Sequence, residues 1–161
     1  LLTTVNAEDM AEKTLRYPGH AEMMKTFRTI GFFGTEPIEI GPNTRVRPID
    51  LTAKLFFKDW KMDTGEADFT IMRIIVEGKR KNQHKRFVFD LLDRFDPKAS
   101  VHSMARATGY TATTVLRLLA KGLYTKKGIS PPEYLGRSKD HVNFILQRLK
   151  ERGVVYKMSE R

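Results

Sequence analysis

The sequence predicts an α+β fold, in which several helices cover a largely antiparallel β-sheet. Residues 68–76 (DFTIMRIIV) are β-branched and aromatic, and residues 86–95 repeat this character after a polar connection. Two such segments in succession indicate a β-hairpin. A later segment carries apolar residues at the spacing of one helix face: Val142, Ile145, Leu146 and Leu149.

Composition narrows the class of protein. The chain has 161 residues, of which 40% are hydrophobic, so we expect one domain with its own core over residues 1–161. It has no cysteine, which excludes disulfides and thiolate metal sites. No apolar run reaches membrane-spanning length and no signal peptide is visible, so we expect a cytoplasmic protein without a membrane partner.

The net charge of +10 arises from 29 basic and 19 acidic residues. Such a charge favours anionic partners, whether polyanions, small carboxylates or the phosphate of a cofactor. Charge alone does not choose among these three classes of ligand.

The first half of the chain is predicted to alternate strands, helices and loops. Residues 1–5 and 13–17 are expected to be strands, and because the first begins without a methionine we expect a piece of a longer protein. A helix follows Pro18 and ends at Gly31, with a loop after it over residues 35–47. A second helix begins near Pro48. The apolar face of the first helix contains Met23, Met24, Phe27 and Ile30, which we interpret as core packing.

The second half opens with the predicted hairpin, whose tip at residues 78–85 is basic. That tip is either a phosphate or nucleic-acid contact or a solvated loop that prevents edge-to-edge aggregation. Residues 100–120 are predicted to form two short helices separated by Gly109. Ser138 is predicted to cap a final helix that ends at Gly153, and residues 154–158 to form a last strand.

The segment Thr14-Leu15-Arg16-Tyr17-Pro18-Gly19-His20 is the strongest candidate for a binding site. It combines a guanidinium, a phenol and an imidazole at a predicted strand-to-helix junction, where side chains and backbone amides are exposed together. An arginine in such a place can hold a carboxylate with two hydrogen bonds. The alternative is that Arg16 forms a surface ion pair and Tyr17 packs as a half-buried side chain.

Residues 103–122 (SMARATGYTATTVLRLLAKG) also match a helix-turn-helix, with Gly109 at the turn. In that case the chain is a basic DNA-binding module, and Arg117 and Lys121 are the expected contacts. The pattern is short, and any two small helices joined at a glycine satisfy it.

Other motifs of enzymes are missing from the sequence. There is no glycine-rich dinucleotide fingerprint, phosphate-binding loop, paired-histidine zinc motif or nucleophile elbow. The four histidines are scattered, so we expect no metal site, and His84 has no second ligand at a suitable spacing. The chain alone is therefore poorly equipped for catalysis.

Three stretches together resemble the carboxyl-terminal, substrate-binding part of the saccharopine dehydrogenase family. They are KTLRYPGHAEMMKTFRTIGFF (13–33), FTIMRIIVEGK (69–79) with its partner strand, and SMARATGYTATTVLRLLAKG followed by KKGISPPEYLG and ILQRLKERGVVY. Their order and approximate spacing match the family over nearly the whole chain. The resemblance also accounts for the apparent helix-turn-helix as part of an oxidoreductase, so a nucleic-acid partner is not expected.

The resemblance implies a two-part enzyme that oxidatively cleaves a secondary amine of an amino acid. A Rossmann domain outside this chain would bind NAD or NADP, and this chain would contribute a mixed sheet, the substrate pocket and often a homodimer contact. Hydride leaves the carbon that bears nitrogen, and water then releases an amino acid and an aldehyde; saccharopine gives glutamate and aminoadipate semialdehyde. We therefore expect the chain alone to bind no cofactor and to be inactive.

The resemblance also assigns roles to particular residues. The substrates carry several carboxylates, and Arg16 matches a substrate-contacting position of the family, with Thr14 and Tyr17 as hydrogen-bond partners. His20 and the Thr108-Gly109 pair are further candidates for the substrate cleft. No general base is assigned. A dimerisation domain whose pocket has decayed is the remaining alternative.

Overall fold

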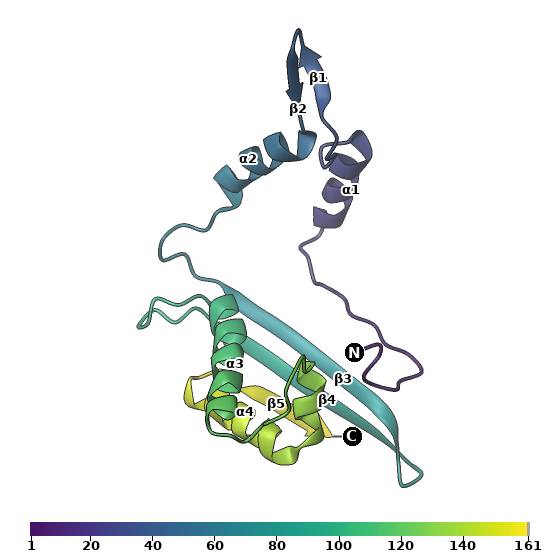
Figure 1. Cartoon of the computed structure of the whole chain (residues 1–161), viewed down its shortest axis with the longest axis vertical. Coiled ribbons are helices and arrows are strands. Elements are labelled where there is room, and N and C mark those ends of the chain that lie inside the picture. Colours follow the sequence, from purple (N-terminus) through teal and green to yellow (C-terminus); the bar gives the residue numbers. More distant parts are fainter. Residues whose placement is uncertain (161) are drawn as a thin grey trace. The chain divides into compact units, whose positions relative to one another are not determined.

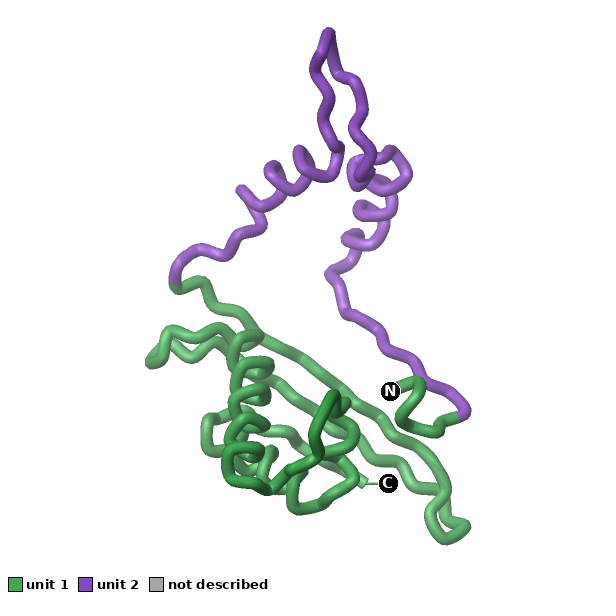
Figure 2. Tube along the Cα trace, viewed as in Figure 1, with its two compact units in different colours: residues 1–7, 65–161 green, residues 8–64 purple. Residues whose placement is uncertain are grey.

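The computed structural model describes residues 1–160 and divides the chain into two compact units (Figure 2). One unit comprises residues 1–7 together with the chain from Gly65 onward, and the other comprises residues 8–64. Each unit is described by itself.

The unit of residues 8–64 contains two helices and a small hairpin (Figure 1). Helix α1 (His20–Ile30) is followed by β1 (Ile38–Gly41) and β2 (Thr44–Val46), which pair antiparallel, and then by α2 (Pro48–Trp60). Gly31 ends α1 with φ of 101°, the left-handed conformation expected of a C-cap glycine. The predicted start of the second helix at Pro48 is also confirmed.

Aromatic rings connect the two helices of this unit. Phe27 of α1 lies 5.3 Å from Phe56 of α2 between ring centroids, and Phe56 lies 4.5 Å from Trp60. The buried Thr52 hydroxyl donates a hydrogen bond of 2.8 Å to the carbonyl of Phe32, which ties α2 to the segment after α1. Neither helix buries an apolar residue completely, and these tilted ring contacts join the two helices.

The other unit is built on a three-stranded antiparallel sheet in the order β3-β4-β5 (Figure 1). Its strands are β3 (Phe69–Arg80), β4 (Gln83–Arg94) and β5 (Tyr156–Glu160). The predicted hairpin is confirmed, and its strands extend into the basic segment at residues 78–85. Only Lys81 and Asn82 form the turn, with φ of 53° and 61°, the values of a two-residue turn that matches strand twist.

Helices α3 (Ser103–Ala120) and α4 (Lys139–Glu151) lie on one face of this sheet, with the short 3₁₀ helix η1 (Pro132–Arg137) preceding α4 (Figure 1). The core joins Leu91 of β4, Leu149 of α4 and Val154. It is surrounded by the partly buried side chains of Ala107, Tyr110, Ile145 and Tyr156. Ser138 caps α4 by accepting a hydrogen bond from the amide of His141, as predicted.

The α+β prediction is confirmed, but several local predictions are wrong. Residues 1–5 form a turn and residues 13–17 are irregular rather than extended in a sheet. The predicted loop at residues 35–47 contains the β1–β2 hairpin. The final strand begins at Tyr156 instead of residue 154. A strand requires a partner for its backbone groups, and a local pattern does not show whether that partner exists.

The predicted pair of helices over residues 100–120 is likewise wrong, because α3 is a single helix of 18 residues. Gly109 lies inside it and not at a turn. The helix-turn-helix interpretation therefore fails at its central element, and Arg117 and Lys121 belong to no recognition helix of that kind. An isolated glycine lowers helix stability by only about 1 kcal/mol, which 17 other residues and packing on the sheet offset.

Candidate functional site

A type II β-turn fixes the direction in which the chain leaves the Thr14–His20 segment. Gly19 has φ of 85° and ψ of −20°, and the amide of His20 donates a hydrogen bond of 3.1 Å to the carbonyl of Tyr17. Proline and glycine at the two central positions are the residues that such a turn favours. Gly19 also precedes α1 as its N-cap residue. The turn places Tyr17 and Arg16 immediately before a helix.

The side chains of this segment are open to solvent. Tyr17 is 80% exposed, and Arg16 and Thr14 are exposed as well. The Arg16 guanidinium has one polar contact, a long hydrogen bond of 3.4 Å to the carbonyl of Leu15, and Thr14 donates to Glu12 at 3.4 Å. The alternative of a surface ion pair for Arg16 therefore finds no carboxylate among the described residues 1–160. Its guanidinium is accessible to an anion.

His20 begins α1 and is half-buried against Trp60, with 6.2 Å between the ring centroids. Through Trp60 the imidazole joins the ring cluster of Phe56 and Phe27. The contact fixes one end of the Thr14–His20 segment to α2.

Thr108 and Gly109 lie in the middle of α3, in the other unit. Both residues are exposed. The Thr108 hydroxyl donates a short hydrogen bond of 2.6 Å to the carbonyl of Met104, one turn earlier. Thr14, Arg16, Tyr17 and His20 belong to residues 8–64, so the six predicted site residues fall into two groups, one in each unit.

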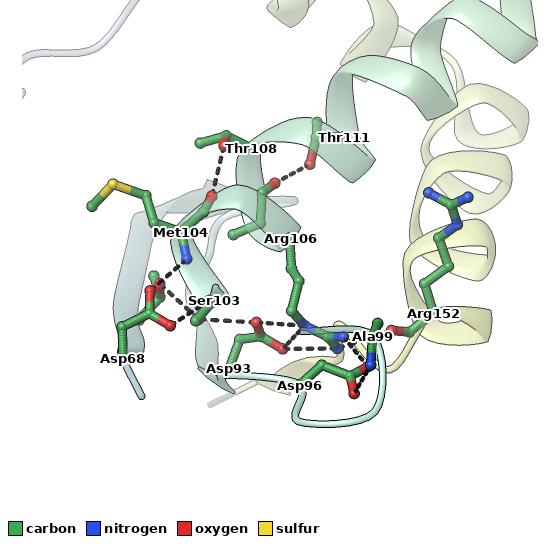
Figure 3. Close-up of polar contacts among 12 residues, drawn as sticks. Asp68, Asp93, Asp96, Ala99, Ser103, Met104, Arg106, Thr108, Thr111 and Arg152 are labelled. Atoms are coloured by element: carbon green, nitrogen blue, oxygen red, sulfur yellow. Dashed lines mark hydrogen bonds and ion pairs between the residues drawn. The ribbon is translucent and has the colours of Figure 1, made fainter. Parts of the chain in front are cut away.

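The N-terminus of α3 is held by a carboxylate from outside the helix. Asp68, directly before β3, accepts hydrogen bonds from the amides of Ser103 (2.6 Å) and Met104 (3.0 Å) (Figure 3). Burial raises the pKa of Asp68, but these amides, together with the charge of His102, outweigh that effect and leave it lower than usual. A carboxylate at this position also interacts favourably with the partial positive charge at the N-terminal end of the helix dipole.

The buried Ser103 connects this cap to a second carboxylate. Its hydroxyl donates to Asp93 of β4 at 2.9 Å (Figure 3). The same hydroxyl lies 2.8 Å from the hydroxyl of Thr70 of β3. Thr70 and Asp93 are direct partners in the hairpin register, so both side chains point to the face that α3 covers. The start of α3 is therefore bonded to both strands.

Arg106 is the centre of the same network (Figure 3). Its Nε lies 3.1 Å from Asp93, one terminal nitrogen lies 2.8 Å from Asp96, and the other donates to the carbonyl of Arg152 at 2.9 Å. Burial lowers the pKa of Arg106, whereas Asp93 and Asp96 more than compensate, so the net change is upward. The guanidinium thus joins α3, the end of β4 and the end of α4.

Sequence reasoning missed this network, although one signal was present. Asp93 falls on the same face of its strand as Phe87, Phe89 and Leu91, so an alternating apolar pattern ends in a carboxylate. A charged side chain at a core position requires a partner. Nothing in the local sequence identified Arg106 as that partner, because it lies 13 residues away on a helix.

The network has the properties of a structural element, because its donors and acceptors are satisfied by one another. Among the described residues, no group of three or more His, Cys, Asp or Glu side chains could hold a metal ion. Within the same residues, no helix has the length and apolarity needed to cross a membrane.

The family assignment follows from the sequence as a whole. The family model of the saccharopine dehydrogenase C-terminal domain matches residues 1–154 of the 161, which includes both units and every predicted site residue. The resemblance inferred from the three sequence stretches is thereby confirmed. The chain belongs to the saccharopine dehydrogenase C-terminal domain family, a domain of oxidoreductases.

Proposed function

We propose that the chain is the substrate-binding part of an NAD(P)-dependent oxidoreductase that acts on the CH–NH group of a secondary amine of an amino acid, with saccharopine as the model substrate. Its place in the family supports the class of enzyme. The reaction is the oxidative cleavage of this amine, and the contribution of the chain is to bind and orient the carboxylates of the substrate.

The observation that carries the proposal is the accessible guanidinium of Arg16. The Pro18-Gly19 turn follows it, and its one polar contact with the described residues is a 3.4 Å bond to a neighbouring carbonyl. A carboxylate ligand would therefore need to displace only this long hydrogen bond. By accepting two parallel N–H bonds from the Arg16 guanidinium, the carboxylate would form a charge-assisted interaction worth about 1.5–3 kcal/mol. Thr14 and Tyr17 present hydroxyl groups on the same short segment.

His20 is a further residue of this proposed site. His20 would line it as a ring fixed against Trp60, with an imidazole able to donate to the same ligand. Thr108 and Gly109 of α3, in the other unit, are proposed separately as substrate contacts, and the absence of a Gly109 side chain leaves that helix surface open for close approach.

The described residues do not fit a Rossmann-type dinucleotide site. Such a site requires parallel strands and a glycine-rich turn that leads from a strand into a helix. Both sheets formed by residues 1–160 are antiparallel, and the segment that leads from β2 into α2 contains no glycine. We propose that NAD or NADP is held outside this chain and that the chain alone has no turnover. A steady rate of NAD(P)H formation from saccharopine by the isolated chain would refute this.

The substrate proposal is tested by titrating the chain with saccharopine and following binding by calorimetry. Arg16→Gln removes the charge and is expected to weaken binding at least tenfold, whereas Arg16→Lys, which lacks the two-pronged geometry, should be intermediate. The matched control is Arg28→Gln, an exposed arginine near the end of α1. Equal affinities for the Arg16 and Arg28 variants would contradict the proposal.

We also propose that the chain forms a homodimer through the face of the β3–β4 hairpin that α3 and α4 leave uncovered. The register places Phe69, Ile71 and Ile75 of β3 and Leu92 of β4 on that face, and all four are exposed. An apolar group of this kind marks an interaction surface. Light scattering should give twice the chain mass, and Ile71→Lys should give the monomer mass. A monomeric unmodified chain would refute the dimer.

A further inference from the structure

A small hollow between α3 and α4 has no role in the functions proposed above. It has a volume of about 70 Å³. It is lined by three arginines, one threonine and one glutamate: Thr114, Arg117, Arg148, Glu151 and Arg152. We refer to these five residues as the arginine groove.

Positive charge in the arginine groove is only partly neutralised. Its one carboxylate, Glu151, lies 2.8 Å from a terminal nitrogen of Arg148 and also accepts a bond of 3.3 Å from Gln147. Arg117 is exposed, and its guanidinium has no hydrogen bond or ion pair to any of the described residues. Three guanidinium groups around one carboxylate leave an excess of two positive charges at the hollow.

Arg152 contributes the second of these charges and is held in place from two sides. Its guanidinium lies 4.3 Å from the ring centroid of Tyr110, and its carbonyl accepts the 2.9 Å hydrogen bond from Arg106. Figure 3 shows the Arg152 side chain pointing away from Asp93 and Asp96, the carboxylates that neutralise Arg106. The Tyr110 ring contacts the flat face of the Arg152 guanidinium. The N–H donors lie at the edge of the guanidinium plane and therefore remain available to a ligand.

Thr114 adds a hydroxyl donor at the same place. The residue is 3% exposed, and its hydroxyl makes no hydrogen bond to another described residue, whereas the hydroxyls of Thr108, Thr111 and Thr113 on the same helix all bond to carbonyls of the preceding turn. The hydroxyl is not among the side-chain polar atoms that are fully buried without a partner, so it is open to the hollow and to a hydrogen-bond partner there. A ligand in the hollow could supply that partner.

We propose that the arginine groove binds a dianionic oxyanion of the size of a phosphate group. Arg117 and Arg152 would donate N–H bonds to its oxygens, and Thr114 would donate its hydroxyl. A volume of 70 Å³ corresponds to about two water molecules at liquid density, which accommodates one such group but not a nucleotide. The group is either free inorganic phosphate or the phosphate of a larger molecule that extends into solvent.

The test uses the full chain and inorganic phosphate, with side-chain Arg Nε–H resonances followed by NMR. Potassium phosphate is titrated against potassium chloride at the same ionic strength, so that general screening is removed from the comparison. Saturable shifts at Arg117 and Arg152 with phosphate, and none with chloride, are expected. Shifts that are linear in phosphate, or that chloride reproduces, would overturn the proposal.

Two variants and a control make the assignment specific. Arg117→Gln changes an exposed side chain and is expected to weaken phosphate binding at least tenfold, the scale of one charge-assisted hydrogen bond. Thr114→Val should weaken it severalfold. Arg137→Gln, which removes a guanidinium stacked on Tyr134 of η1, should leave it unchanged. An equal loss in the Arg117 and Arg137 variants would overturn the site.

A parallel titration with phenyl phosphate distinguishes the two sources of the group. Tighter binding of the ester than of inorganic phosphate identifies the phosphate of a larger molecule, and tighter binding of inorganic phosphate identifies the free ion. This inference does not depend on the proposed substrate site. Because Arg16 lies outside the arginine groove, Arg16→Gln should leave phosphate binding intact.

Discussion

Arg106 and Asp93 form a buried ion pair, with Nε of the arginine 3.1 Å from the carboxylate and the side chains only 7% and 4% exposed. The pair joins the first turns of α3 to the end of β4. Asp96 and the carbonyl of Arg152 accept hydrogen bonds from the two terminal nitrogens of the guanidinium. This arrangement fixes α3 on the sheet and, through Arg152, fixes one wall of the arginine groove.

Replacing Arg106 by Met is expected to lower the free energy of unfolding by about 3–5 kcal/mol. The apolar side chain fills much of the volume but leaves the Asp93 carboxylate buried without a counter-charge. Urea denaturation monitored by circular dichroism measures the loss. Arg73→Gln is the control, because the Arg73–Asp90 pair of the hairpin is exposed to solvent and should contribute little to stability. Similar losses in both variants would contradict a special role for Arg106.

Gly109→Ala is expected to stabilise the chain by about 0.5–1 kcal/mol. Gly109 lies inside α3, and a Cβ built there meets no atom within 4 Å, so the substitution only improves helix propensity.

Gly153→Ala is the matched contrast. Gly153 has φ of 81°, and its Cβ would lie 3.1 Å from a terminal nitrogen of Arg106. We expect destabilisation there. If thermal denaturation instead shows that Gly109→Ala destabilises the chain, a turn exists at this position and the single-helix description of α3 is incorrect.

Low pH should destabilise the unit that contains the three-stranded β3-β4-β5 sheet. Backbone amides of Ala99 and Lys98 lower the pKa of Asp96, and those of Met104 and Ser103 outweigh burial to lower that of Asp68. Since both folded-state values lie below the unfolded value of about 3.9, the unfolded chain binds protons first as pH falls. The stabilisation is therefore complete above about pH 5 and declines below about pH 4.

Urea midpoints at pH 7, 5 and 3 measure this dependence. Asp68→Asn should lower the midpoint at pH 7, because the amide side chain caps the helix without charge, and it should reduce the drop between pH 5 and pH 3. An unchanged drop in this variant would exclude Asp68 as one of the groups responsible.

Long segments with a clear periodicity could be predicted from sequence. Short segments, and segments whose structure depends on a partner strand elsewhere, could not. The β3–β4 hairpin and α4 follow from alternation and from a repeated i, i+3, i+4 spacing, which are local properties. The strands expected at residues 1–5 and 13–17 had suitable residues but no partner strand. The β1–β2 hairpin was missed because its prolines and glycine favoured a loop, although the turn residue Asn43 tolerates its φ of 57°.

The candidate site could be predicted in part for a related reason. The chemistry of Arg16 and the start of a helix after Pro18 are legible in seven consecutive residues, but the strand expected before Pro18 is absent and the type II turn at Pro18-Gly19 was not predicted. The Arg106–Asp93 pair and the arginine groove depend instead on how α3 packs against β4 and α4. Contacts between residues 13 to 46 positions apart are properties of the tertiary fold.

The Arg16 Nε–H resonance of the ¹⁵N-labelled chain, followed during addition of saccharopine, tests the central claim most directly. We predict a shift that saturates with ligand and that a secondary amine of similar length without carboxylates does not produce. If saccharopine moves other resonances to saturation and leaves that of Arg16 in place, or moves none, then Arg16 does not hold the substrate carboxylate.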